Sequence, residues 1–329
     1  MKKRCISGIK PTGQLTLGNY IGAIRNFIKL QDEYDTYYFV ADLHALTMGD
    51  NNPTELIEHK KNIVALYLAC GLDPQKSTIF YQSQVTEHAM IQWLLTCETT
   101  LGELNRMTQF KDKSQKVSRQ SNGTDKIPTG LLIYPTLMAG DILLYNANLV
   151  PVGEDQTQHI ELTRNIALRM NNKYKTNFVI PEGFTPKVGA RIKSLSDPSQ
   201  KMSKSETSKS TIYLLDDPDL AYKKIIKAVT DSDNKVFISD DKPGVLNLLN
   251  IYASLKDISL EQAQEHFKDS DYKEFKTQVA QSVKDLLINI QEKYKYFIDK
   301  VEQITAEGAA KAKTIASPIL NDFMKKVGL

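Results

Sequence analysis

Positively charged side chains gather in the polar stretch Q-K-M-S-K-S-E-T-S-K-S, residues 200–210. It contains Lys201 and Lys204, and Met202 is its only apolar residue. Stretches rich in serine and lysine usually connect folded parts as flexible linkers. A loop of this kind can also carry lysine charges to a phosphate. Composition alone favours the linker, so the other motifs of the chain have to decide.

A carboxylate stands in an unusual place at Asp141, inside the apolar helical pattern L-M-A-G-D-I-L-L-Y at 137–145. Burial of a carboxylate without a partner is costly. Asp141 is therefore expected to be exposed, to be paired with an internal donor, or to await a donor on a ligand. An exposed or internally satisfied aspartate is the commonest outcome for such a residue.

A glycine-rich segment, S-G-I-K-P-T-G-Q-L-T-L-G-N-Y-I-G, covers residues 7–22. Its glycine spacing fits neither G-x-G-x-x-G nor the P-loop, which argues against a dinucleotide site and a kinase-type phosphate loop. Gly18 would allow the close approach of a flat ring, and Thr16 and Asn19 offer neutral hydrogen-bond donors to phosphate. A turn that only reverses the chain is the alternative.

Strands and helices alternate in the first half of the chain, which indicates a doubly wound parallel sheet. In such a sheet, ligands bind beyond the carboxyl ends of the strands. The expected strands cover residues 5–9, 36–41, 78–81 and 148–152, and the expected helices cover 18–30, 53–69, 155–170 and a segment from about 87.

Helical patterns dominate after about residue 190. Expected helices begin at Pro218 and, with a capping-box pattern, at Ser259, and others cover 244–255 and 275–297. Ser317-Pro318 has the pattern of a helix start. We therefore expect a Rossmann-like catalytic domain at 1–190 and an all-helical domain at 191–329, and we allow for the last helix, about 303–329, packing back on the first domain.

The composition is that of an ordinary globular protein, with 41% hydrophobic residues, 25% charged residues and a net charge of +3 over 329 residues. Three widely spaced cysteines, and no secretory or membrane-length segment, favour the cytoplasm. No motif indicates a structural metal. Neither a membrane nor DNA is expected as a partner.

Two segments together resemble the signatures of the class I aminoacyl-tRNA synthetases: P-T-G-Q-L-T-L-G-N at 11–19 and K-M-S-K-S at 201–205. The segments 102–114, 134–146 and 150–164 are similar to those of bacterial tryptophanyl-tRNA synthetases, as are G-A-R-I at 189–192 and A-V-T-D-S-D at 228–233. The resemblance covers nearly the whole chain. It changes the interpretation of 201–205 from a linker to a catalytic loop, while Glu206–Ser210 remain a linker.

The resemblance implies an ATP site and its charged residues. The residues that it implies for ATP are Lys10, Pro11, Thr12, Gly18, Asn19, Gly153, Glu154, Asp155, Ile192, Lys201, Met202, Ser203, Lys204 and Ser205. The catalytic cations would be Lys201 and Lys204, with Lys113 or Lys111 opposite them. Lys10 departs from the family, which has a neutral amide there, and it either adds a phosphate contact or extends to solvent.

The resemblance also implies a tryptophan pocket, in which Asp141 binds the indole N–H. This suits a carboxylate, which can only accept a hydrogen bond. The pocket would consist of Asp141, Gln156, His44, Met138, Val150, Val152, Ile6 and Tyr134. For Met138 and the two valines, ordinary core packing is the stronger reading. Ile6 stands where tyrosine-specific relatives have a tyrosine and where tryptophanyl enzymes often have phenylalanine.

The implied activity is tryptophan–tRNA ligation. ATP with Mg²⁺ activates L-tryptophan to its adenylate with release of pyrophosphate, and the acyl group then passes to the 3′ end of tRNA(Trp). The helical domain would meet the anticodon, and the resemblance implies a homodimer. Two alternatives stay open at this point: a tyrosine-specific synthetase of the same fold, and a catalytically silent paralogue that binds RNA or nucleotide.

Overall fold

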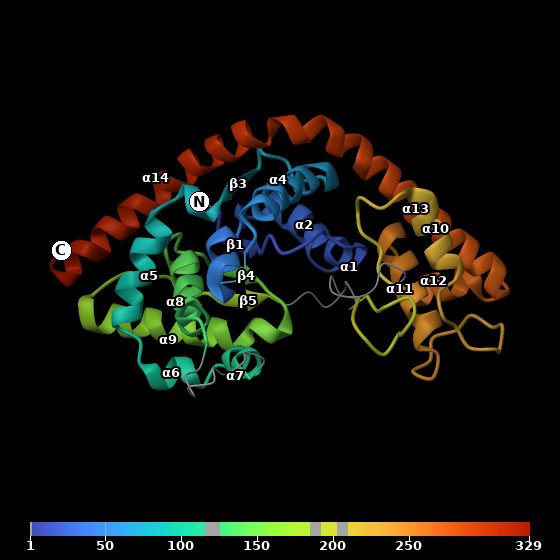
Figure 1. The fold of residues 1–329 in the computed structure, drawn as a ribbon, viewed down its shortest axis with the longest axis horizontal. Helices are drawn as coiled ribbons and strands as arrows, with labels where there is room; N and C mark the ends of the chain where they lie inside the picture. The colour runs from blue at the N-terminus through green and yellow to red at the C-terminus, as the bar shows by residue number, and fades with distance from the viewer. Residues whose placement is uncertain (1, 50, 116–125, 185–191, 203–209) are drawn as a thin grey trace.

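Five parallel strands form one sheet in the first half of the chain (Figure 1). The computed structural model describes residues 2–49, 51–115, 126–184, 192–202 and 210–329. The strand order is β3-β2-β1-β4-β5, with bounds Arg4–Ile9 (β1), Asp35–Val40 (β2), Ser77–Tyr81 (β3), Leu149–Pro151 (β4) and Glu182–Phe184 (β5). The four expected strands are present. The sequence gives no signal for β5, which has only three residues, all of them exposed.

Helices cover both faces of the sheet. They span Leu17–Asn19 (α1), Arg25–Glu33 (α2), Asp42–Ala45 (α3), Pro53–Cys70 (α4), Glu87–Cys97 (α5), Leu101–Asn105 (α6), Thr108–Ser114 (α7), Thr129–Leu143 (α8) and Thr157–Tyr174 (α9). Successive residues of a strand point to opposite faces. Tyr38 and Val40 of β2 therefore pack with α2 and α4, whereas Tyr37 and Phe39 pack with α5, α8 and α9.

The second half is helical, as expected. Its helices span Pro218–Ile226 (α10), Pro243–Lys256 (α11), Leu260–Phe267 (α12), Tyr272–Phe297 (α13) and Val301–Val327 (α14). Ser259 caps α12 in the predicted capping box, in which its hydroxyl accepts from the backbone N–H of Gln262. Apolar residues of α11, α12 and α13 share a core with α2 and α4 of the first half.

The last helix differs from the expectation that Ser317-Pro318 begins it. α14 runs without a break from Val301 to Val327, with Pro318 inside it, and crosses β3 toward the far end of the molecule (Figure 1). Its backbone lies so close to β3 that a Cβ on Gly308 would come 1.9 Å from the carbonyl oxygen of Ile79. Beyond that point its buried side chains belong to the core of the sheet. Packing along the whole helix thus outweighs the local stop signal at Pro318. None of the described helices is both long and apolar enough to cross a membrane.

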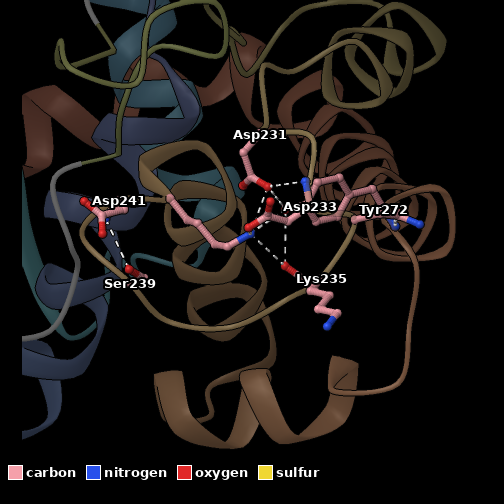
Figure 2. Close-up of polar contacts among 8 residues, drawn as sticks. Asp231, Asp233, Lys235, Ser239, Asp241 and Tyr272 are labelled. Atoms are coloured by element: carbon pink, nitrogen blue, oxygen red, sulfur yellow. Dashed lines mark hydrogen bonds and ion pairs between the residues drawn. The ribbon is translucent and has the colours of Figure 1, made fainter.

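The segment that carries A-V-T-D-S-D forms an ion cluster around a buried lysine in the helical half (Figure 2). Lys242 is only 4% exposed, and its Nζ lies 2.8 Å from Asp231 Oδ1 and 3.0 Å from Asp233 Oδ2. The hydroxyl of Tyr272 donates to Asp231 Oδ1 at 2.6 Å. Burial would lower the pKa of Lys242, but the hydrogen bonds to Asp231 and Asp233 raise it. The cluster ties the loop before α11 to the start of α13, and we call it the Lys242 clamp.

Candidate active site

The glycine-rich turn follows β1 at the carboxyl edge of the sheet, where ligands bind in this class of fold. Thr16 caps α1, and its backbone N–H and hydroxyl both donate to Asn19 Oδ1, at 3.0 and 3.1 Å. The hydroxyl in turn accepts from the Asn19 backbone N–H at 3.2 Å. The capping box therefore occupies the Thr16 hydroxyl, so Thr16 is not a free donor to phosphate as the sequence suggested.

Met202, of the second signature segment, lies beside this turn. The N–H of Met202 donates to the carbonyl of Ile192, and the N–H of Leu17 donates to the carbonyl of Ile212, each at 2.9 Å. A Cβ on Gly18 would lie 3.7 Å from the Cβ of Ile192 and 3.9 Å from that of Met202. Three residues implied for ATP thus meet at one point, although they come from distant parts of the chain.

Met202 and Ile192 are buried, at 4% and 2% exposure, whereas Lys201 beside them is exposed. The single apolar residue of the polar stretch therefore belongs to the core of the molecule. Ser203, Lys204 and Ser205 lie outside the described residues. Ser210, expected to be linker, is buried, and its carbonyl accepts from the N–H of Leu195.

Two lysines approach the ring of Tyr134, which is buried on α8. The Nζ atoms of Lys10 and Lys113 lie 5.5 and 5.8 Å from its centroid. Burial and the positive charge of Lys113 lower the pKa of Lys10 to about 8. Lys10 is thus half-buried near a second cation rather than extended to solvent, and an anion between them would be stabilised. Lys111 is exposed on α7, so Lys113 is the lysine of this pair that faces the turn.

Asp141 is almost fully buried on α8, at 2% exposure, and three donors surround its carboxylate. His44 Nε2 lies 2.8 Å from Oδ2, while Gln82 Nε2 and His88 Nδ1 lie 2.7 and 2.6 Å from Oδ1. Burial alone would raise the pKa of Asp141, but the hydrogen bonds from His44 and His88 lower it to about 2. Of the outcomes expected from the sequence, internal pairing is the one observed, and it keeps the group an anion.

Tyr134 links the lysines to this buried network. Its hydroxyl lies 2.6 Å from His159 Nε2, and its ring packs edge-on against His44 with centroids 6.2 Å apart. Burial lowers the pKa of His159 to about 4, so this histidine is neutral near pH 7. The Nδ1 atom of His159 has no partner among the described residues.

The segment after β4 brings further implied residues to the same edge of the sheet. Asp155 Oδ2 accepts from the side-chain amides of Gln156 and Gln109, at 2.7 and 3.3 Å. Gly153 lies so close that its Cβ would be 2.7 Å from Asp155 Oδ1, and Glu154 begins the 3₁₀ turn Glu154–Gln156 (η4).

The remaining implied residues divide between core and surface. Ile6 and Val150 lie on the neighbouring strands β1 and β4 and are buried in the core of the sheet, against which Met138 and Val152 pack. The contacts that the structure gives for these four side chains are those of ordinary core packing. Near the turn, Pro11 is buried and Thr12 is exposed.

Sequence reasoning missed three polar residues of this site, Gln82, His88 and Tyr145. His88 Nε2 lies 2.9 Å from the Tyr145 hydroxyl, so the network continues past Asp141. One signal was available: Gln82 directly follows β3 at the edge of the sheet where ligands bind. The histidine and the tyrosine carry no signal of this kind.

The whole chain is similar to known enzymes. The profile of the family described as tRNA synthetases class I (W and Y) matches residues 1–325. The tryptophan–tRNA ligase of Mycoplasmopsis pulmonis is 57% identical over 329 residues, which are 100% of this chain and 98% of the relative. The chain therefore belongs to the class I tRNA synthetases of the tryptophan and tyrosine group.

Solved structures within that group agree with the tryptophan branch. The tryptophanyl-tRNA synthetase from Mycoplasma pneumoniae has a TM-score of 0.91 and 40% identity, covering 100% of this chain and 98% of that one. The enzyme from Campylobacter jejuni, solved with ADP and tryptophan, has a TM-score of 0.81 and 32% identity, covering 99% and 100%. These full-length likenesses are to enzymes of tryptophan, which decides against the tyrosine-specific alternative left open by the sequence.

Proposed function

We infer that this chain is a tryptophan–tRNA ligase that uses ATP to attach L-tryptophan to tRNA(Trp). The observation that carries this conclusion is the full-length identity to the Mycoplasmopsis enzyme. The gathering of Gly18, Ile192 and Met202 at the carboxyl edge of the sheet supports it, because the two signature segments have to meet around one nucleotide.

The first reaction step joins a carboxylate oxygen of tryptophan to the α-phosphorus of ATP, while the bond from that phosphorus to the oxygen of pyrophosphate breaks. The nucleophile is already an anion, so no general base is needed. Positioning and compensation of charge on the departing pyrophosphate provide the catalysis. We assign the compensating charges to Lys201, Lys204 and Lys113, with Lys111 as the alternative to Lys113. In the second step the terminal ribose hydroxyl of the tRNA attacks the acyl carbon and loses its proton, while the bond from that carbon to the phosphate oxygen breaks and AMP leaves.

The ATP site that we propose follows the turn, the second signature and the β4 loop. Lys10 contributes a phosphate contact, because it is half-buried beside Lys113. Ile192 and Met202 cover the adenine. The other members are Pro11, Thr12, Gly18, Asn19, Gly153, Glu154, Asp155, Ser203 and Ser205.

In the proposed tryptophan site, Asp141 accepts the indole N–H and Gln156 meets the amino or carboxylate group. Oδ2 of Asp141 accepts only from His44 among the described residues, which leaves an acceptor position on that oxygen. The ring would lie among His44, Tyr134, Met138, Val150, Val152 and Ile6. Ile6 has no hydroxyl to pair with a phenol, which favours tryptophan over tyrosine.

We propose that Mg²⁺ enters with ATP, held by phosphate oxygens. The described residues contain no cluster of His, Cys, Asp and Glu side chains able to hold a metal, and a magnesium ion on phosphates needs no such cage. No step above is assigned to it.

The remaining proposals concern domains, partners and location. We propose residues 1–190 as the catalytic domain and 191–329 as the domain that meets the anticodon. In the lysine run 223–227, Lys224 is already bound to Asp216 and to the carbonyl of Thr211, so Lys223 and Lys227 are the exposed lysines of the run. A homodimer and a cytoplasmic location complete the proposal, the latter because the cysteines are free thiols.

Exchange of labelled pyrophosphate into ATP, screened across the twenty amino acids, tests the activity. We expect tryptophan alone to drive rapid exchange. Exchange driven by tyrosine, or by no amino acid, would overturn the conclusion.

A further inference from the structure

The buried network around Asp141 contains residues that no part of the proposed mechanism uses. Gln82 and His88 are both 0% exposed, and both donate to Asp141 Oδ1. Tyr145, also 0% exposed, contacts the other nitrogen of His88. These residues come from the end of β3, the first turn of α5 and the segment just after α8.

Close packing of two helices holds this arrangement in place. A Cβ on Gly140, the residue before Asp141, would lie 2.9 Å from Ile91 Cγ2 and 3.4 Å from the backbone nitrogen of Gln92. The glycine therefore lets α8 approach α5 closely enough for His88 to reach the carboxylate. The ring of His88 is also packed among Phe39, Phe80 and Tyr145, with centroids 5.7, 6.0 and 5.5 Å away. Its orientation is thus fixed on every side.

Hydrogen-bond chemistry assigns the proton on His88. An ionised carboxylate can only accept, so Nδ1 of His88 carries the hydrogen that bonds to Asp141. In a neutral ring Nε2 is then an acceptor, and the Tyr145 hydroxyl is positioned to donate to it. The relay from Tyr145 through His88 to Asp141 holds one tautomer and one carboxylate orientation.

Among the described residues, the network around Asp141 has more hydrogen-bond acceptor positions than donors. Oδ1 of Asp141 accepts two hydrogen bonds and Oδ2 accepts one from the described residues. The Gln82 amide must donate through Nε2, and its Oε1 is buried without a partner among those residues. Buried acceptors of this kind normally find a donor, and a ligand N–H would supply one.

We propose that His88, supported by Tyr145 and Gln82, is a positioning residue. It orients the carboxylate of Asp141 so that this group accepts a hydrogen bond from the indole N–H. By occupying Oδ1, His88 and Gln82 leave Oδ2 as the oxygen available to the ligand. His88 touches no reacting atom. The inference rests on the proposed function, because it requires Asp141 to meet the indole.

The test compares tryptophan with its benzothiophene isostere, β-(benzothiophen-3-yl)alanine, in which sulfur replaces the N–H. The measured quantity is the ratio of kcat/KM for the two amino acids in pyrophosphate exchange. In His88→Leu we expect this ratio to fall about tenfold to a hundredfold, the range for a hydrogen bond to a charged group. The loss should come from a higher tryptophan KM, with the ATP KM and the isostere nearly unaffected.

Two further variants separate positioning from packing. In His88→Asn an amide nitrogen can take the place of Nδ1, so the ratio should stay within about threefold of wild type. Tyr145→Phe removes only the hydroxyl and should lower the ratio about threefold. His266→Leu, a change at an exposed histidine of α12, is the matched control and should leave it unchanged.

Equal losses for tryptophan and the isostere in His88→Leu, or no loss for either, would overturn the inference. If His88→Leu does not fold, an unchanged ratio in Tyr145→Phe has the same consequence. The proposed function is judged separately by wild type and Asp141→Ala. If the wild type prefers tryptophan, Asp141→Ala abolishes this preference and His88→Leu keeps it, only the role of His88 is refuted. If the wild type shows no tryptophan-dependent exchange, both the role of His88 and the proposed function are refuted.

Discussion

Asp141 and Lys242 are two buried charges that the fold treats differently. The partners of Asp141 lie 53 to 97 positions away in the sequence, on three separate elements. Those of Lys242 lie within 30 positions, on its own loop and the start of α13. Asp141 contacts His44 and Gln82, which follow β2 and β3 at the carboxyl edge of the sheet, whereas Lys242 lies in the helical half.

The difference indicates that a buried charge with partners can have either of two roles, stabilising a loop or orienting a group toward a ligand. Lys242 joins pieces of nearby chain, so its partners define a loop. Asp141 is held by distant elements, and Oδ2 keeps an acceptor position among the described residues, so in the function that we propose its partners define a direction for the ligand. Changes at the catalytic edge should alter kinetics, and changes at the Lys242 clamp should alter stability.

The largest expected effect is that of Lys204→Ala, in the second signature segment. We expect exchange to fall about 10²–10³-fold, the loss that follows removal of one donor to transition-state charge. Lys273→Ala, at an exposed lysine of α13, is the matched control and should exchange at the wild-type rate. Unchanged exchange in Lys204→Ala would remove this lysine from the mechanism.

Asp141→Ala should raise the tryptophan KM about tenfold to a hundredfold, because the indole N–H loses a charged acceptor. The ATP KM should change by less than about twofold. Both constants come from initial rates of exchange, after thermal unfolding has shown that the variant is folded. Equal rises in the KM values for tryptophan and ATP would show that Asp141 has a structural role, like Lys242, and that the two charges do not differ in function.

Lys242→Met should lower the melting temperature by several degrees, since it leaves Asp231 and Asp233 without their cation. Both KM values should stay at wild-type levels.

The pKa of Asp231 is about 2, below its ordinary 3.8, through hydrogen bonds from Lys242 and Tyr272 that outweigh the effect of burial. A carboxylate with a lowered pKa stabilises the fold above its ordinary pKa, and this stabilisation is lost as the pH falls from about 4 toward 2. Thermal unfolding across that range should show less acid dependence in Lys242→Met than in wild type.

The smallest effect concerns Lys10. Its pKa of about 8 makes it a cation near pH 7 and largely neutral near pH 9. The ATP KM of the wild type should therefore rise severalfold between about pH 7 and pH 9. In Lys10→Arg the rise should be smaller, because a guanidinium keeps its charge. Parallel pH profiles for the two proteins would show that Lys10 does not meet the nucleotide.

Local patterns were enough to predict much of the fold. Strands β1 to β4 follow from their β-forming apolar runs, and the start of α12 follows from the capping box at Ser259. The strand β5 and the continuation of α14 through Pro318 could not be predicted, because both depend on packing against distant chain.

The site was predictable in its residues but not in its connections. Asp141 was noticeable in the sequence because burial of a carboxylate in an apolar helix is costly unless the carboxylate has a partner. Of its partners, His44 was implied by the resemblance, whereas Gln82 and His88 were missed, since no local pattern indicates that three elements converge on one carboxylate. Such convergence is a property of the tertiary fold.

The path of α14 limits how this molecule can be divided. A truncation near residue 190, where the composition changes, would also remove Ala312, Ala316 and Phe323, which complete the core of the sheet. The half that contains the sheet would then expose an apolar face and the backbone of β3 that Gly308 now covers. A shortened protein that retains activity must therefore keep both ends of the chain.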